Sequence, residues 1–503
     1  SGVVLLLLLV VYIDCLVAAS SLQKQLIDKH VLKNRFRIHY KEVYAPAESE
    51  SLYPVPNEKY GGFFMKMPLD HFNDTGNSKT FYNRYWVNTD YYKPNGPIIC
   101  KLNYIHASNF FNVKVTSLFL PVYNVGESAA DESAILVTNS TMAQLAEKLN
   151  GIIIIMEHRF YGSSGPNSHT KEDLETFNAK QALADMAYMV SNIKFRNIIV
   201  PPIPQTKVIV YGCSYSGVLA AWAKDTYPNL FFAAVSSSAP VQADIDFYKY
   251  FDPIINYGPK HCVSSLQDVT FGQILMGDIA GAWQYGINST YNEFEEVICK
   301  LFPEGETSNI EANLISYSKY INSYSRNTLC DKKNEALQKC LVETNQTATD
   351  LASEFSDDNA AWMWQTCTEF GFFQASPPAE LPTIISRKFS YTSFIDQCHI
   401  LFSKDGVPSI PNVAGINNLY KGWNIELNRT IWIDGEWDSW RELSVNNLAV
   451  DRKFDTGYST SIIIPGATHC FNVAEITKDT PQYLVNVFTQ QYQTLYAWLH
   501  ESV

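Results

Sequence analysis

Residues 208–222 read VIVYGCSYSGVLAAW, and this stretch decides the fold of the chain. A β-branched apolar run, typical of a buried strand, meets a corner rich in glycine and serine and turns directly into a helix-forming run. This layout is typical of a nucleophile elbow, which exposes a serine hydroxyl on a tight turn beside a base and oxyanion donors. Ser214 is the candidate nucleophile, although Ser216 stands where the usual G-x-S-x-G pattern has its second glycine. A corner with an incidental serine is the alternative interpretation.

Further β-rich runs surround this corner and indicate a mostly parallel sheet. Strands are expected at residues 152–156, 207–211, 233–236, 430–433 and 461–464. Helical patterns at 178–193 and 218–227 separate the first three, as in βαβ units. The sheet therefore resumes after a long interruption.

The interruption differs in character, because it contains cysteines and mostly helical patterns. An insertion between the strands of a doubly wound sheet lies above their carboxyl ends, where such sheets bind ligands. We therefore expect a leader at residues 1–19, the first part of the sheet domain at 20–245, a helical cap at 246–404 and the second part of the sheet domain at 405–503.

Composition narrows the classes of partner. The chain has 503 residues, of which 46% are hydrophobic and 14% aromatic, as in globular proteins. Its net charge of −13 argues against nucleic acid, because phosphate binding needs clustered lysine and arginine.

The N-terminus resembles a secretory signal. Residues 3–11 are apolar (VVLLLLLVV), Asp14 interrupts the run, and Val17, Ala18 and Ala19 precede Ser20 as a small-residue cleavage site. Because it lacks an initiator methionine and a basic region, we expect a truncated start. No later run of about 18 apolar residues occurs, so no membrane span is expected in the mature chain. The predicted destination is extracellular, or the lysosomal or vacuolar lumen.

Secretion changes how the cysteines and asparagines are interpreted. In an oxidising compartment, disulfides are expected among Cys262, Cys299, Cys330, Cys340, Cys367 and Cys398. No C-x-x-C pair occurs, so a zinc site is not expected. No metal or other cofactor is predicted for the chain. N-glycans are expected at the sequons of Asn73, Asn139, Asn288, Asn345 and Asn428.

A serine nucleophile needs a histidine base and a carboxylate to orient it. His469 follows one of the last two predicted strands, in a loop that contains glycine, and Asp438 follows the other. The order Ser214, Asp438, His469 is the chain order of the α/β-hydrolase triad. Asp434 and Glu436 compete with Asp438 for the acid role.

Six signatures in the chain resemble one family, the secreted or lysosomal serine peptidases that include Pro-X carboxypeptidase, dipeptidyl peptidase II, thymus-specific serine protease and the fungal prolyl endoproteases. The signatures are MPLDHFN at 67–73, EHRFYGSS at 157–164, QALAD at 181–185, SSAP at 237–240, QTCTEFGFF at 365–373 and DGEWDSW at 434–440. They run from about residue 60 to about residue 475 in the family's order.

This resemblance implies an α/β-hydrolase fold with an inserted helical, disulfide-bearing cap domain. It also implies Ser214 as nucleophile, Asp438 as orienting acid, His469 as base, and cleavage on the carboxyl side of proline. The chain departs from the family pattern in four places, because the family favours glycine at Cys213, Ser216 and Val125 and proline at Ser439.

The remaining site residues follow from the mechanism. The backbone N–H of Tyr215 is one expected oxyanion donor, and Gly126 in an early loop supplies the second. Glu127 is a candidate partner for a substrate amine. An apolar slot for proline could be formed by Trp364, Phe372, Phe373 and Trp440, each of which could equally be an ordinary core aromatic.

Residues 100–121 (CKLNYIHASNFFNVKVTSLFLP) separate an early strand from that loop. Without them the strand would run directly into the Gly-Glu pair with the family's pattern. A translated, unspliced intron and a genuine insertion are both open, and the sequence of the mature transcript decides between them.

The leading hypothesis is a secreted serine peptidase that cleaves proline-containing peptides. The alternatives are a carboxylester hydrolase on the same fold and a catalytically impaired relative. Whether a peptidase would act as an endopeptidase, carboxypeptidase or dipeptidyl peptidase is left open by the sequence.

Overall fold

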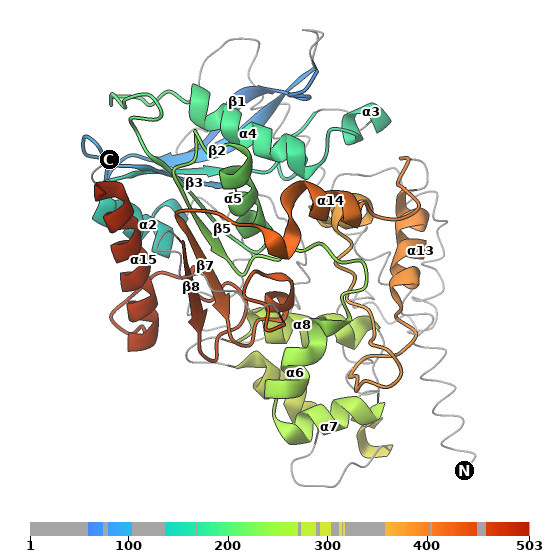
Figure 1. Ribbon diagram of the computed structural model, residues 1–503. Helices are drawn as coiled ribbons and strands as arrows, with labels where there is room; N and C mark the ends of the chain where they lie inside the picture. The colour runs from blue at the N-terminus through green and yellow to red at the C-terminus, as the bar shows by residue number, and fades with distance from the viewer. Residues whose placement is uncertain are drawn as a thin grey trace, which may run out of the picture.

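The computed structural model describes most of the chain from residue 59 onward. The described residues are 59–73, 79–102, 136–166, 170–269, 273–287, 292–302, 311–313, 315–316, 358–402, 405–449 and 459–501. They build one twisted sheet with helices on both faces, and a group of further helices beyond one end of it (Figure 1). The expected leader and residues 103–121 lie outside the described part.

The described residues form an eight-stranded sheet in the order β1-β2-β4-β3-β5-β6-β7-β8. The strands are β1 (Gly61–Pro68), β2 (Thr80–Asn88), β3 (Ile98–Leu102), β4 (Ile152–Met156), β5 (Val208–Cys213), β6 (Ala233–Ser237), β7 (Thr430–Gly435) and β8 (Ser459–Ile464). β2 pairs antiparallel with β1 and β4, and every other neighbouring pair is parallel. A mostly parallel sheet whose central strand turns through an elbow into a helix is the α/β-hydrolase fold, which confirms the predicted fold class.

Alternate residues of the central strands face opposite layers. Ile152 and Ile154 lie in a core shared with helices α4 and α5, whereas Ile153 and Ile155 lie in a core shared with α2 and α15. The helices are α2 (Thr141–Leu149), α3 (Lys171–Leu174), α4 (Ala179–Asn192), α5 (Tyr215–Thr226), α6 (Asp252–Tyr257), α7 (Lys260–Val269), α8 (Gln273–Tyr285), α12 (Asp358–Gln365), α13 (Tyr391–Phe402), α14 (Val413–Tyr420) and α15 (Gln482–His500). Because both faces of the sheet are covered at its centre, a central strand such as β4 is apolar along its whole length.

The helices α6 to α14 fall between β6 and β7, as expected for an inserted cap. Figure 1 shows α6 and α8 beyond the carboxyl ends of β7 and β8. Disulfides Cys262–Cys299 and Cys367–Cys398 lie within this insertion. Cys330 and Cys340 lie outside the described residues, and the boundary at residue 404 stays a prediction.

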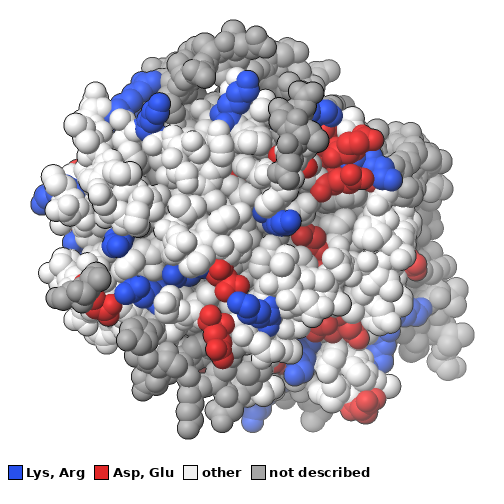
Figure 2. Space-filling model, turned by 45° about the horizontal axis from the view of Figure 1, so that its top comes forward, with Lys and Arg blue, Asp and Glu red and all other residues white. Residues whose placement is uncertain are grey.

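Charged side chains are spread over the described surface. On the face drawn in Figure 2, lysine and arginine side chains lie among uncharged and acidic residues and form no continuous basic band in the part that is described. In the same part of the chain, no helix is long and apolar enough to cross a bilayer.

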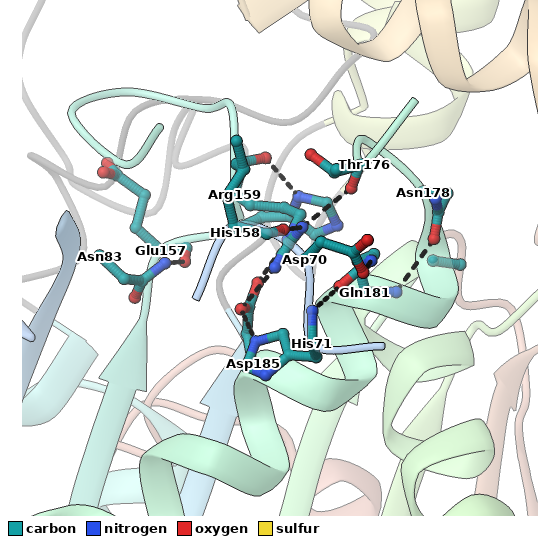
Figure 3. Close-up of polar contacts among 12 residues, drawn as sticks. Asp70, His71, Asn83, Glu157, His158, Arg159, Thr176, Asn178, Gln181 and Asp185 are labelled. Carbon is teal, nitrogen blue, oxygen red and sulfur yellow. Dashed lines mark hydrogen bonds and ion pairs between the residues drawn. The ribbon is translucent and has the colours of Figure 1, made fainter. Parts of the chain in front are cut away.

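A buried ion pair joins three of the sequence signatures. Arg159 donates to both carboxylate oxygens of Asp185, from Nε at 2.6 Å and from Nη2 at 2.7 Å (Figure 3). Nη1 of Arg159 donates to the backbone carbonyls of Leu69 and Thr176, and His71 Nε2 lies 2.7 Å from Asp185 Oδ1. Burial opposes the charge of Asp185, but the guanidinium outweighs it and the pKa of Asp185 is lowered. The signatures around residues 70, 159 and 185 therefore meet in one buried hydrogen-bond network.

We predict that Asp185→Asn lowers the free energy of unfolding by about 3–5 kcal/mol, because it leaves the Arg159 guanidinium buried without a counter-charge. Asp225→Asn is the matched control, since Asp225 pairs with Lys421, whose side chain is 49% exposed. We expect that change to cost about 0–1 kcal/mol. Denaturant unfolding of both variants checks the difference, and equal losses would contradict it.

Glu369 ties the insertion to the sheet domain. It lies in a short π-helix (Thr366–Phe370), is buried, and its carboxyl oxygens accept the Ala179 N–H at the start of α4 at 3.0 and 3.2 Å. Burial raises the pKa of Glu369 to about 8, against an ordinary value of 4.5. The folded protein therefore holds this proton more tightly than the unfolded chain does.

Such a group contributes stability that is fully present below its unfolded pKa and is lost as the pH rises through its folded pKa. Glu369→Gln keeps an acceptor for the Ala179 N–H but has no proton to lose. We predict that its melting temperature matches wild type at about pH 4 and exceeds it at about pH 8. Thermal melts across this range test the prediction, and parallel pH profiles for the two proteins would refute it.

Candidate active site

Ser214 lies at the corner between β5 and α5, in a conformation that few residues adopt. Its φ is 59° and its ψ is −133°, outside the helical and extended regions. At two glycine positions next to this corner, there is no room for a side chain. A Cβ on Gly212 would overlap the carbonyl oxygen of Ser216, and a Cβ on Gly217 would lie 2.6 Å from the carbonyl oxygen of Ser237. This geometry matches the strained strand-to-helix turn of a nucleophile elbow.

The departure at Ser216 fits inside this corner. The Ser216 hydroxyl donates to the carbonyl oxygen of Cys213 at 2.7 Å and lies 3.1 Å from the Cys213 N–H, from which it accepts. Its side chain folds back onto the turn and is buried. The serine therefore braces the elbow in place of the family's glycine.

His469 and Asp438 lie together in the loops that follow β8 and β7. Nδ1 of His469 lies 2.9 and 3.0 Å from the two carboxylate oxygens of Asp438, and both side chains are buried. A carboxylate only accepts, so Nδ1 donates and Nε2 is the basic nitrogen. Within the described part of the chain, this buried Nε2 has no hydrogen-bond partner. The ring is thus oriented with its basic nitrogen available.

The competing acids have other partners. Asp434 accepts from Ser444 Oγ at 3.1 Å and from Asn446 Nδ2 at 2.7 Å, and Glu436 accepts from the Gly466 N–H at 2.9 Å. Burial, with the nearby charge of Asp438, raises the pKa of Asp434 well above its usual range. Of the three acids considered, the structure brings Asp438 onto His469.

A disulfide joins the two halves of the site. Cys213 directly precedes Ser214, Cys470 directly follows His469, and the two cysteines are bonded with their Cα atoms 5.8 Å apart. From the sequence, Cys213 is a departure from glycine for which no partner is predicted. The signal was present, because both cysteines stand next to predicted catalytic residues and outside the central cysteine group.

Tyr215, the first residue of α5, is fixed by a chain of hydrogen bonds. Tyr161 Oη donates to Gln365 Oε1 at 2.6 Å, and Gln365 Nε2 donates to Tyr215 Oη at 2.9 Å. Tyr215 Oη in turn lies 3.4 Å from Nε2 of His158. Burial lowers the pKa of His158 to about 4, so the ring is neutral, and its Nδ1 donates to the Arg159 carbonyl at 2.8 Å. The helix terminus beside Ser214 is therefore held from the sheet domain and from the insertion.

The four aromatic residues that are expected to form the proline slot lie in two different places. The Trp440 ring lies 6.3 Å from His469, and Phe372 packs against Trp440 with ring centroids 5.4 Å apart. Trp364 packs edge-on against Phe402, and Phe373 stacks on Phe394, both within the insertion. Gly126 and Glu127 lie outside the described residues.

Trp362, two residues before Trp364 in α12, packs beside the elbow. Its ring lies 5.6 Å from Tyr215 and 6.4 Å from Phe372. Residues two apart in a helix face roughly opposite sides, so Trp362 and Trp364 of α12 do not line one surface together.

The insertion also reaches the loops of Asp438 and His469. Trp283 Nε1, from α8, donates to the carbonyl oxygen of Trp437 at 3.0 Å. Tyr285, also on α8, packs edge-on against the His469 ring with centroids 5.8 Å apart. α8 therefore covers the base from the side of the insertion.

Among the described residues, no cluster of three or more histidine, cysteine, aspartate or glutamate side chains is arranged to hold a metal ion. The chemistry available to the site is that of a hydroxyl, an imidazole and a carboxylate. Such a set can transfer an acyl group through a covalent intermediate.

Known proteins resemble this chain over most of its length. The human thymus-specific serine protease is 26% identical over 491 residues, covering 87% of this chain and 86% of that protein. Serine protease vicPb of Bipolaris victoriae is 26% identical over 456 residues, covering 78% and 80%. The "Probable extracellular serine carboxypeptidase" of Arthroderma benhamiae is 26% identical over 489 residues, and the match covers 82% of this chain but 63% of the fungal protein's length.

Among solved structures, a proline iminopeptidase of Mycobacterium smegmatis matches with a TM-score of 0.36 and 12% identity, over 86% of this chain and 99% of that chain. The fold assignment rests on the strand order and not on this likeness. The family model described as serine carboxypeptidase S28 matches residues 67–280 and 264–489. Because these matches cover far more than half of the chain, the protein belongs to the serine carboxypeptidase S28 family.

Proposed function

We propose that this protein is a secreted serine peptidase that hydrolyses peptides on the carboxyl side of proline. Ser214 is the nucleophile, His469 the general base and Asp438 the orienting acid. The observation that carries the proposal is the His469 ring, whose Nδ1 lies 2.9 and 3.0 Å from the Asp438 oxygens while its buried Nε2 has no partner among the described residues. A histidine held in this way is ready to accept a serine proton.

In the first half-reaction, Ser214 Oγ attacks the carbonyl carbon of the scissile bond and its proton passes to His469 Nε2. The imidazolium that forms is stabilised by Asp438. The tetrahedral intermediate collapses when His469 returns the proton to the leaving amine, and the acyl group stays on Ser214 as an ester.

In the second half-reaction, water attacks this ester. His469 takes a proton from the water and then protonates Ser214 Oγ as the acid product leaves. Each step passes one proton through Nε2, and neither step needs a metal or another cofactor.

Negative charge on the carbonyl oxygen is stabilised by the backbone N–H of Tyr215. The first N–H groups of an α-helix point out of its end, where the dipole favours an anion. The hydrogen bonds of the Tyr215 side chain to Gln365 and His158 support this role, because they fix the residue that supplies the donor. Gly126 is the proposed second donor.

Specificity for proline is supported by the family resemblance and by the aromatic rings beside the histidine. Trp440 lies beside His469 and Phe372 packs against Trp440, and a pyrrolidine ring packs well against flat aromatic rings of this kind. Trp364 and Glu127 stay candidates for substrate binding. Extracellular or lysosomal location is supported by the leader-like residues 3–11 and by the disulfides.

N-glycans are proposed at the sequons. Asn73, Asn139 and Asn428 are exposed, as an acceptor asparagine must be, whereas Asn288 and Asn345 lie outside the described residues.

Asp438→Asn tests the triad most sharply. The amide cannot hold His469 in the required tautomer, so we expect kcat to fall about 10⁴-fold with the fold intact. Asp434→Asn is the matched control. It changes a neighbouring buried carboxyl that accepts from Ser444 and Asn446 and is not bonded to His469, so most activity should remain. Equal losses in both variants would contradict the assignment.

A panel of chromogenic peptides tests the specificity. At mildly acidic pH, we expect kcat/KM for a proline at the cleaved carbonyl to exceed that for alanine by about 10–200-fold, the range one apolar pocket achieves. Peptides with a free amino end, a free carboxyl end or both ends blocked distinguish dipeptidyl peptidase, carboxypeptidase and endopeptidase action.

The same panel decides between the reaction classes when Ser214→Ala is included as the blank. Turnover of short-chain esters without any peptide cleavage would replace the proposal with a carboxylester hydrolase. No turnover of either kind, in a folded protein, would indicate a catalytically impaired relative.

A further inference from the structure

The Cys213–Cys470 disulfide lies where a covalent bond has the most influence on the proposed reaction. It spans 257 residues of sequence, yet its two ends are the immediate neighbours of Ser214 and His469. The other disulfides of the described residues, Cys262–Cys299 and Cys367–Cys398, each close a short loop within the insertion.

The backbone at this junction is held away from its preferred conformations. Ser214 has a φ of 59°, Ser238 of 45° and Cys470 of 59°, all in the left-handed region that non-glycine residues rarely adopt. Such conformations persist only where the surrounding structure determines them. The disulfide joins the segment that contains Ser214 to the segment that contains Cys470, so it helps to maintain these two backbone conformations.

Hydrogen bonds connect the same segments through the end of β6. The Ser214 N–H donates to the Ser237 carbonyl, and the Cys470 N–H donates to Ser238 Oγ, both at 2.9 Å. Ser237 Oγ donates to Asn472 Oδ1. The elbow and the histidine loop are therefore linked by one covalent bond and, through β6, by neutral hydrogen bonds.

The histidine loop is attached to the acid loop independently of the disulfide. The Trp437 N–H donates to the Ala467 carbonyl at 2.9 Å, and His469 is bonded to Asp438. Without the disulfide, the pair of His469 and Asp438 keeps these bonds, whereas its placement relative to Ser214 loses its covalent constraint.

We propose that the Cys213–Cys470 disulfide positions His469 against Ser214, which makes both cysteines positioning residues for acyl transfer. This inference rests on the proposed function. It also gives the departure from the family at Cys213 a physical reason, because glycine there could not form the bond.

The test is the rate at which a fluorophosphonate labels Ser214 in the full-length protein. In Cys213→Ala/Cys470→Ala we expect labelling to slow about 10–100-fold, since a misplacement of about 1 Å costs on the order of 100-fold in rate. Cys262→Ala/Cys299→Ala is the control and should label at the wild-type rate. Thermal melts of both variants separate positioning from stability.

A second readout distinguishes positioning from a general structural role. In a His469→Ala background, where labelling is already slow, removing the disulfide should cause no further loss, because the two changes act through the same group. An additive loss would overturn the inference, as would wild-type labelling without the disulfide or equal losses in the control pair. Failure of the wild-type protein to label at all would instead overturn the proposed function.

If the double variant does not fold, reduction of the folded wild-type protein provides the measurement. A water-soluble phosphine converts each disulfide to two thiols and takes the oxygen of one water molecule to become a phosphine oxide. Labelling should fall in step with alkylation of Cys470, followed by mass spectrometry. A fall that instead follows Cys262 or Cys367, or no fall once Cys470 is alkylated, would overturn the inference.

Discussion

The corner between β5 and α5 has room for nothing larger than hydrogen at two positions. A Cβ on Gly212 would overlap the Ser216 carbonyl, and one on Gly217 would lie 2.6 Å from the Ser237 carbonyl. This close approach of helix, turn and neighbouring strand places Ser214 at a φ of 59°, between the end of the sheet and the start of a helix. Ser214, the proposed nucleophile, lies at this corner, and Tyr215, the proposed oxyanion donor, follows it directly. His469, the proposed base, is connected to the corner through the Cys213–Cys470 disulfide.

Three kinds of contact maintain the corner, and each comes from a different part of the chain. Ser216 stabilises the turn by a hydrogen bond to the Cys213 carbonyl. The hydrogen-bonded chain Tyr161–Gln365–Tyr215–His158 holds the start of α5. Cys470 is bonded to Cys213, at the end of β5. The buried Arg159–Asp185 ion pair connects sequence signatures that are far apart along the chain. The cost of burying those charges is balanced by their mutual pairing, which makes the network intolerant of losing one partner.

The fold could be predicted, and the triad proposed, because both depend on local pattern. Runs of β-branched residues between helical segments marked β4 to β8 within a few residues, and Asp438 and His469 stood at the ends of two such runs. Spacing alone left Asp434, Glu436 and Asp438 open, because all three lie at the end of the same strand; the family resemblance favoured Asp438, and the structure pairs Asp438 with His469. The partner of Cys213 and the packing of Trp362 against Tyr215 depend on contacts between segments far apart in sequence, which local pattern does not encode.

The central claim is that Ser214, His469 and Asp438 act as one acyl-transfer unit. A crystal structure of the protein after reaction with a fluorophosphonate tests it most directly. The account predicts phosphorus bonded to Ser214 Oγ, a phosphonyl oxygen accepting the Tyr215 N–H, and His469 Nε2 within hydrogen-bonding distance of an oxygen of the adduct. An adduct on another residue, or a His469 ring turned away from Ser214, would contradict it.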